Sequence, residues 1–205
     1  PRTPYSTRAM ADDVAAVLDH ARIARADLFG MSLGGMIAQE FAIHHGGRLD
    51  RLVLGCTTAG GSSAEPVRFE AAWPALRAQL GDRQRANAAE ARLILSQAYL
   101  DDHPEVLLRW DEVKRLDPTP RITMVLQIMA AVRHDASRDL HRITAPTLIV
   151  TSDSDRLIPP SNSQHLARAI RGSELAGLRG AGHDFATEQA SETAELLREF
   201  LLDSR

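Results

Sequence analysis

Apolar residues in the first part of the chain recur at two different spacings. In residues 7–22 they fall on one face of a helix. The short apolar run at residues 26–29 is too brief for a helix and ends in Gly30, whereas helical spacing returns over residues 36–43 before Gly46. The pattern therefore predicts a helix, a short buried strand, a tight turn and a second helix.

Three further apolar runs have the length typical of buried strands. They cover residues 51–55, 146–151 and 174–178, and the second is rich in β-branched side chains. Helical spacing follows the last two runs, at residues 161–171 and 188–202. Because strands alternate with helices, we expect an α/β fold whose parallel strands are joined by right-handed crossovers.

One connection interrupts this alternation. The segment between Cys56 and Ala145 is far longer than the loops of about 2 to 6 residues and single helix that a βαβ crossover needs. Helical spacing recurs within it over four stretches, at residues 69–80, 86–100, 105–116 and 121–133. We expect a helical cap inserted after the strand that ends near Gly55.

Composition narrows the classes of partner. The 205 residues are 44% hydrophobic, and 24 Lys and Arg residues against 27 Asp and Glu residues leave a net charge of -3. This balance lacks the excess of Lys and Arg that is typical of nucleic-acid-binding proteins. No apolar run approaches the roughly 18 residues that a helix needs to cross a bilayer. Cys56 is the one cysteine, which excludes an intrachain disulfide and fits a reducing compartment. We expect a cytoplasmic protein that binds neither nucleic acid nor membranes.

A candidate nucleophile lies between the first predicted strand and the helix after it. Residues 30–34 are Gly-Met-Ser-Leu-Gly and fit the pattern G-x-S-x-G. In that context small residues two positions on either side of Ser32 allow a turn sharp enough to expose its hydroxyl. The alternative is a serine that caps the helix beside glycines that pack it. A nucleophilic serine also needs a base within hydrogen-bond reach and a group that orients the base.

Candidates for these two groups follow the last two predicted strands. Asp153 and Asp155 come after the strand at residues 146–151, and His183 follows the final strand in the sequence Gly-Ala-Gly-His. The carboxyl ends of parallel strands meet at one edge of a sheet, so either carboxylate could orient His183 toward Ser32. The order Ser, Asp, His along the chain is that of the nucleophile-elbow hydrolases.

On these motifs the sequence resembles the α/β-hydrolase superfamily, and within it the capped serine esterase and lactonase branch similar to 3-oxoadipate enol-lactonases. In that family the acid is the fourth residue of Gly-x-x-Asp-x-x-x-Pro, a position that Asp155 occupies here, with Ser152 in place of the glycine and Pro159 as the proline. Asp153 stays the alternative acid. The family's Gly-x-Gly-His motif makes His183 the base.

The resemblance implies an α/β-hydrolase fold with helices on both faces of a parallel sheet. This chain would supply about the C-terminal half of that sheet, and the N-terminal part of the fold would be absent. We expect three parts: residues 1–60 as the nucleophile-bearing part of the core, residues 61–140 as the helical cap, and residues 141–205 as the acid- and base-bearing part.

The expected function is hydrolysis of a small-molecule carboxylic ester or lactone through an acyl-enzyme on Ser32, without a cofactor or a metal. The amide of Leu33 is one expected oxyanion donor. The resemblance places the second donor upstream of this sequence, so we expect a complementary N-terminal segment or chain to supply it. The candidate substrate-binding residues, for which core packing is the alternative, are Trp73, Met124, Ile128 and Met129. The alternative function is that of a non-catalytic ligand-binding homologue or an inactive truncated fragment.

The remaining histidines show no spacing that suggests a metal site. His44 and His45 stand where a helix is expected to end, which favours a capping role. We expect the others, His134 among them, at scattered surface positions. Cys56 is expected to be a small buried apolar residue.

Overall fold

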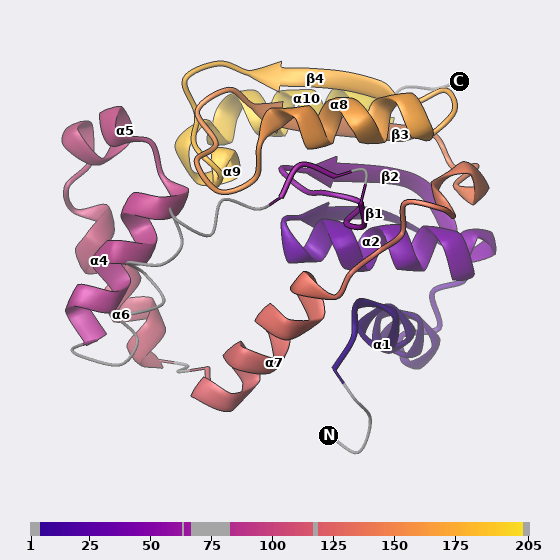
Figure 1. Cartoon of the computed structure of the whole chain (residues 1–205), viewed down its shortest axis with the longest axis horizontal. Coiled ribbons are helices and arrows are strands. Elements are labelled where there is room, and N and C mark those ends of the chain that lie inside the picture. Colours follow the sequence, from indigo (N-terminus) through magenta and orange to yellow (C-terminus); the bar gives the residue numbers. More distant parts are fainter. Residues whose placement is uncertain (1–4, 63, 67–82, 117–118, 203–205) are drawn as a thin grey trace.

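A four-stranded parallel sheet forms the centre of the molecule. The computed structural model describes residues 5–62, 64–66, 83–116 and 119–202. The strands pair in the order β1-β2-β3-β4, all parallel, as Figure 1 shows. They are β1 (Ala26–Met31), β2 (Leu49–Gly55), β3 (Thr147–Ser152) and β4 (Glu174–Leu178). The predicted α/β fold and all four predicted strands are therefore present.

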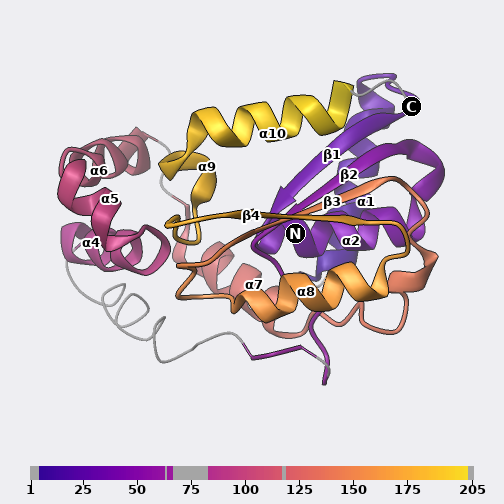
Figure 2. The same cartoon turned by 90° about the horizontal axis from the view of Figure 1, so that it is seen from above.

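Helices cover both faces of this sheet (Figure 2). Successive residues of a strand point to opposite faces, and β2 follows this rule. Leu52 and Leu54 pack on one side in a cluster with residues of α1, α2 and α8, whereas Val53 packs on the other with residues of α10. The bounds of these helices are α1 (Thr7–His20), α2 (Leu33–His44), α8 (Pro160–Ala169) and α10 (Ala190–Leu202).

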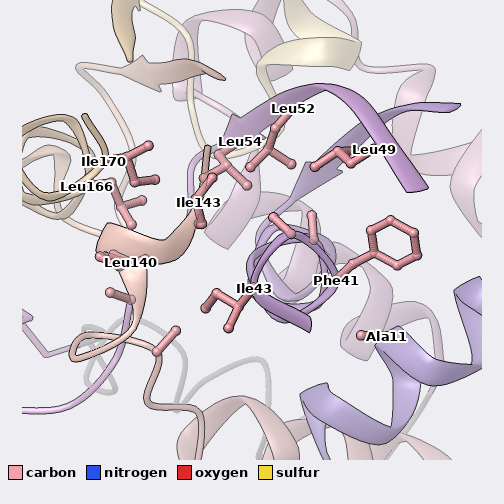
Figure 3. Packing of buried hydrophobic residues seen from close by; sticks show 14 of the residues in the cluster. Ala11, Phe41, Ile43, Leu49, Leu52, Leu54, Leu140, Ile143, Leu166 and Ile170 are labelled. Carbon is pink, nitrogen blue, oxygen red and sulfur yellow. The ribbon is translucent and has the colours of Figure 1, made fainter. Parts of the chain in front are cut away.

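The larger of the two apolar layers lies between the sheet and α2. Figure 3 shows Leu52, Leu54 and Phe41 gathered there, and each is no more than 1% exposed. Burial of such a side chain stabilises the fold by about 2 kcal/mol. Two short 3-10 helices complete the core region, η1 (Gly46–Arg48) before β2 and η2 (Leu140–Arg142) before β3.

β1 forms one edge of the sheet. Within the described part of the chain it pairs with β2 alone, and Phe29 at its centre is 40% exposed. A strand with one free side presents unpaired backbone amides and carbonyls. The outer side of β1 is therefore open to pairing in the part of the chain that the structure describes.

The segment between β2 and β3 contains four α-helices among the described residues. Its helices are α4 (Arg83–Ile94), α5 (Gln97–Asp102), α6 (Val106–Leu116) and α7 (Arg121–Val132). Figures 1 and 2 show α4, α5 and α6 grouped beside α9, apart from the sheet. Leu95, Leu100 and Val106 form a small apolar cluster of their own there. The predicted helix at residues 69–80 lies outside the described residues.

One predicted helix is divided in the structure, and another is preceded by a short helix of its own. The prediction of one helix over residues 86–100 was wrong, because Ser96 adopts extended backbone and its hydroxyl accepts a hydrogen bond from Tyr99 N, which starts α5. The predicted helix over residues 188–202 is confirmed as α10, which ends at Leu202. A short helix α9 (Phe185–Glu188) comes first, with Asp184 as its N-cap, and α10 begins only at Ala190.

His134 corrects another expectation, because it is buried rather than at the surface. It is 4% exposed, and its Nδ1 lies 3.0 Å from Thr7 Oγ1 at the start of α1. Burial lowers the pKa of His134 to about 4, against the opposing effect of the Asp135 carboxylate. In the described part of the chain, none of the helices is both long enough and apolar enough to span a bilayer.

Candidate active site

Ser32 occupies the turn between β1 and α2 in a left-handed backbone conformation, with φ 54° and ψ −121°. Such a conformation is strained for a residue with a side chain and persists only where the surroundings fix it. The end of β2 provides this support: Ser32 N donates to Gly55 O at 2.9 Å, and Thr57 Oγ1 donates to Ser32 O at 2.7 Å. The Ser32 hydroxyl makes no capping bond to α2. The strained turn therefore places Ser32 at the carboxyl edge of the sheet, with its hydroxyl not used as a helix cap.

Close packing around the turn requires two glycines, only one of which the sequence pattern identified. A Cβ atom on Gly30 would lie 2.3 Å from Gly34 O. A Cβ on Gly34 would meet nothing within 4 Å among the described residues, so alanine, the next smallest residue, would also fit there. The second tight position is Gly35, where a Cβ would lie 2.6 Å from the side chain of Thr57.

Asp155 and His183 form a buried hydrogen-bonded pair. His183 Nδ1 lies 2.7 Å from Asp155 Oδ2, and the two residues are 4% and 3% exposed. Asp155 Oδ1 accepts from Leu157 N and Ile158 N at 2.8 and 2.9 Å. Because an ionised carboxylate can only accept, it places the imidazole hydrogen on Nδ1 and leaves Nε2 able to take a proton. This is the tautomer that a general base requires.

The structure separates the two candidate acids. Asp153 is exposed, and its Oδ1 accepts from Gly180 N at 2.7 Å and from Ser154 Oγ at 3.2 Å. These bonds stabilise the turns after β3 and β4. Of the two carboxylates, Asp155 is the one in contact with His183.

Ser152, which stands where the resembled family has glycine, holds the loop that carries His183. Its hydroxyl donates to Gly182 O at 2.6 Å and lies 3.3 Å from Cys56 Sγ. The residue before His183 is thus fixed to the end of β3. Sequence analysis missed this role because it compared Ser152 only with the glycine of the motif.

Cys56 lies beside the pair formed by Asp155 and His183. One possible ligand atom from each of the three residues falls within 4.8 Å of the others. Burial and the nearby Asp155 carboxylate raise the pKa of the Cys56 thiol to about 12. Metal binding would need a thiolate and would break the bond between Asp155 and His183. A neutral thiol packed against a hydrogen-bonded acid and base describes this group better than a metal site.

Most of the other predicted site residues lie on described helices, and one lies outside the described residues. Leu33 is the first residue of α2, so no residue of that helix accepts its amide hydrogen. Met124, Ile128 and Met129 lie on α7, where the last two are 40% and 39% exposed. None of these three residues belongs to the apolar clusters of the described part of the chain. Trp73 lies outside the described residues.

A family model matches most of the chain. It is Hydrolase_4, described as "Serine aminopeptidase, S33", and it matches residues 4–190. A pimeloyl-[acyl-carrier protein] methyl ester esterase of Neisseria meningitidis is 30% identical over 201 residues, which cover 97% of this chain and 76% of that protein. The 3-oxoadipate enol-lactonase 2 of Acinetobacter baylyi is 28% identical over 92% of this chain and 68% of its own length.

Solved structures share the fold. The crystal structure of the enol-lactonase from Burkholderia xenovorans superposes with a TM-score of 0.85 at 24% identity. The match covers 99% of this chain and 75% of that protein. The parallel sheet and its helices are thus arranged as in that lactonase over nearly all of this chain.

Proposed function

The chain belongs to the α/β-hydrolase superfamily, together with esterases and lactonases, and on that basis we propose that it hydrolyses a carboxylic ester or lactone with Ser32, His183 and Asp155 as a catalytic triad. The observation that carries the proposal is the buried bond of 2.7 Å between His183 Nδ1 and Asp155 Oδ2. It lies at the carboxyl edge of the sheet whose first strand presents the strained turn at Ser32.

The chemistry follows from the roles of these three groups. Ser32 Oγ attacks the carbonyl carbon while His183 Nε2 takes its proton, and Asp155 stabilises the resulting imidazolium. That imidazolium gives the proton to the alcohol oxygen as the C–O bond breaks, which leaves an acyl-enzyme. Water attacks the acyl group as His183 removes a proton from it, and the proton returns to Ser32 when the carboxylic acid leaves.

The oxyanion of each tetrahedral intermediate needs hydrogen-bond donors. We assign the Leu33 amide, which directly follows the nucleophile, as one of them. The chain spans about three quarters of the relatives' length, and β1 is an edge strand within the described part. These two facts support a complementary N-terminal segment or chain beside β1 as the source of the second donor. Loss of one such donor typically lowers the rate by about 10² to 10³.

The substrate class rests on the relatives and on α7. One relative is named for a methyl ester and another for an enol-lactone, and both names describe carboxylic ester bonds. The exposed side chains of Ile128 and Met129 on α7 offer apolar surface that core packing does not use. We assign Met124, Ile128 and Met129, together with Trp73, to the binding of the acyl portion.

A fluorophosphonate probe, which reacts covalently with an activated serine, tests the proposal in the complete polypeptide that carries this sequence. We expect labelling together with turnover of p-nitrophenyl acetate, and the loss of both in Ser32→Ala. The matched control is Ser154→Ala, which removes an exposed hydroxyl at the same edge of the sheet and should keep both signals. A folded protein that is not labelled would instead be a non-catalytic binder.

A further inference from the structure

Glu188 joins two parts of the chain that are distant in sequence. It is the last residue of α9, and its Oε1 accepts from Gly182 N at 2.9 Å and from Ser96 N at 2.8 Å. Its Oε2 accepts from Ser96 Oγ at 2.5 Å. One carboxylate therefore binds the residue before His183 and the junction between α4 and α5 at the same time.

A second bond joins the same two parts on the other side of His183. Asp184 N donates to Ile94 O at the end of α4, with a distance of 2.9 Å. The approach is close, because a Cβ on Gly182 would lie 2.7 Å from both Glu188 Oε1 and Ser96 N. Both neighbours of His183 are thus hydrogen-bonded toward the junction formed by Ile94, Leu95 and Ser96.

Hydrogen bonds on both backbone groups of Gly182 restrict the position of the loop that carries His183. Gly182 O accepts from Ser152 Oγ at 2.6 Å, so Gly182 is held by β3 through its carbonyl and by Glu188 through its amide. Hydrogen bonds to a charged acceptor are roughly twice as strong as those between neutral groups. The Glu188 carboxylate therefore links the junction at Ser96 directly to the backbone next to the imidazole.

We propose that Glu188 is a positioning residue that couples the junction between α4 and α5 to His183, so that the placement of these helices sets the orientation of the imidazole. The role of His183 as a base rests on the proposed function, whereas the coupling itself does not. The alternative is a purely structural role, in which Glu188 only closes α9 and caps α5.

The first test measures the coupling without activity. In proton NMR the hydrogen between His183 Nδ1 and Asp155 Oδ2 should resonate far downfield. The signal is assigned to His183 if it is absent from the spectrum of His183→Gln. We expect Glu188→Ala to speed the exchange of this hydrogen with water by about 10-fold or more, together with the exchange of the Ser96 and Gly182 amides. Glu188→Gln keeps an oxygen that accepts from both amides and should restore slow exchange. The matched control is Glu192→Ala, an exposed acid in the first turn of α10.

The second test measures the consequence for the base. Glu188→Ala should lower the rate of fluorophosphonate labelling by about 10- to 100-fold, since small misplacements of a reacting group have effects of that size. Glu188→Gln should recover most of that rate, and Glu192→Ala should match the wild type. If Glu188→Ala fails to fold, Ser96→Ala is the second variant: it removes the Ser96 Oγ bonds to Glu188 and to Tyr99 N and keeps the bond from Ser96 N to Glu188. It should shift both readouts in the same direction.

The outcomes separate the two proposals. Faster exchange at Ser96 and Gly182 with an unchanged His183 signal would overturn the coupling and leave the structural role. If the wild type is not labelled while the His183 signal still responds to Glu188→Ala, the proposed hydrolase function fails and the coupling stands.

Discussion

His183 Nδ1 lies 2.7 Å from Asp155 Oδ2, while two backbone amides hold Asp155 Oδ1 on the other side of the same carboxylate. The two oxygens are not equivalent, and this determines the effect of an amide substitution. In Asp155→Asn the amide oxygen would stay with the backbone amides, and its NH₂ group would face Nδ1. His183 would then adopt the tautomer that cannot take the serine proton.

Asp155→Asn should accordingly lower turnover of p-nitrophenyl acetate by about 10⁴ with little change in the melting temperature. Asp153→Asn is the matched control, because its remaining oxygen can still accept from Gly180 N. We expect it to keep most of the activity. A larger loss in Asp153→Asn than in Asp155→Asn would move the acid to Asp153.

The two glycines of the motif around Ser32 should respond differently to alanine. A Cβ on Gly30 would lie 2.3 Å from Gly34 O, so Gly30→Ala should destabilise the protein by about 1 to 3 kcal/mol and suppress labelling of Ser32. Gly34→Ala adds a methyl group that meets nothing within 4 Å in a helix, which should stabilise the protein by up to about 1 kcal/mol. Urea unfolding of the two variants checks both signs, and equal destabilisation would contradict this account.

Thr57 should matter through its hydroxyl rather than its volume. Its Oγ1 donates to Ser32 O at 2.7 Å, and Thr57→Val removes that donor while it keeps the branched shape. We expect a loss of about 1 kcal/mol in unfolding free energy and slower labelling of Ser32. Thr57→Ser keeps the hydroxyl and should label at close to the wild-type rate. If Thr57→Ser were the slower variant, packing against Gly35 would be the main role.

His134 should make the folded protein sensitive to acid. Its pKa is about 4 in the folded state, against an ordinary value of 6.5, because burial disfavours the charged imidazole. Between these values the unfolded chain binds more protons than the folded one, so stability is lost as the pH falls from about 6.5 to about 4. This group contributes at most about 3 kcal/mol to that loss.

The check is urea unfolding at pH 7 and pH 4.5 for the wild type and for His134→Asn. The variant should lose about 2 kcal/mol less between the two pH values, since its side chain does not titrate. Carboxylates that do not contact His134 contribute equally to both proteins and cancel in the comparison. An equal loss in both would show that His134 is not the group responsible.

Much of the fold could be predicted because it depends on local regularities. The apolar runs that became β2 and β3 lie in the middle of the sheet, where most residues of a strand are buried and the sequence shows a continuous apolar stretch. The division of the predicted helix at Ser96 was missed, because helical spacing of apolar residues continues across it. The capping hydroxyl of Ser96 then determines where α5 begins.

The sequence by itself determined the strand order along the chain, the turn at Ser32 and the positions of Asp155 and His183, because each depends on a short motif next to a regular element. Only the tertiary structure decided which carboxylate meets His183, that His134 is buried, and that Glu188 bonds Ser96 from 92 residues away. The physical reason is that backbone periodicity acts over a few residues, whereas these contacts form only after separate segments have packed together. Their partners leave no pattern in the local sequence.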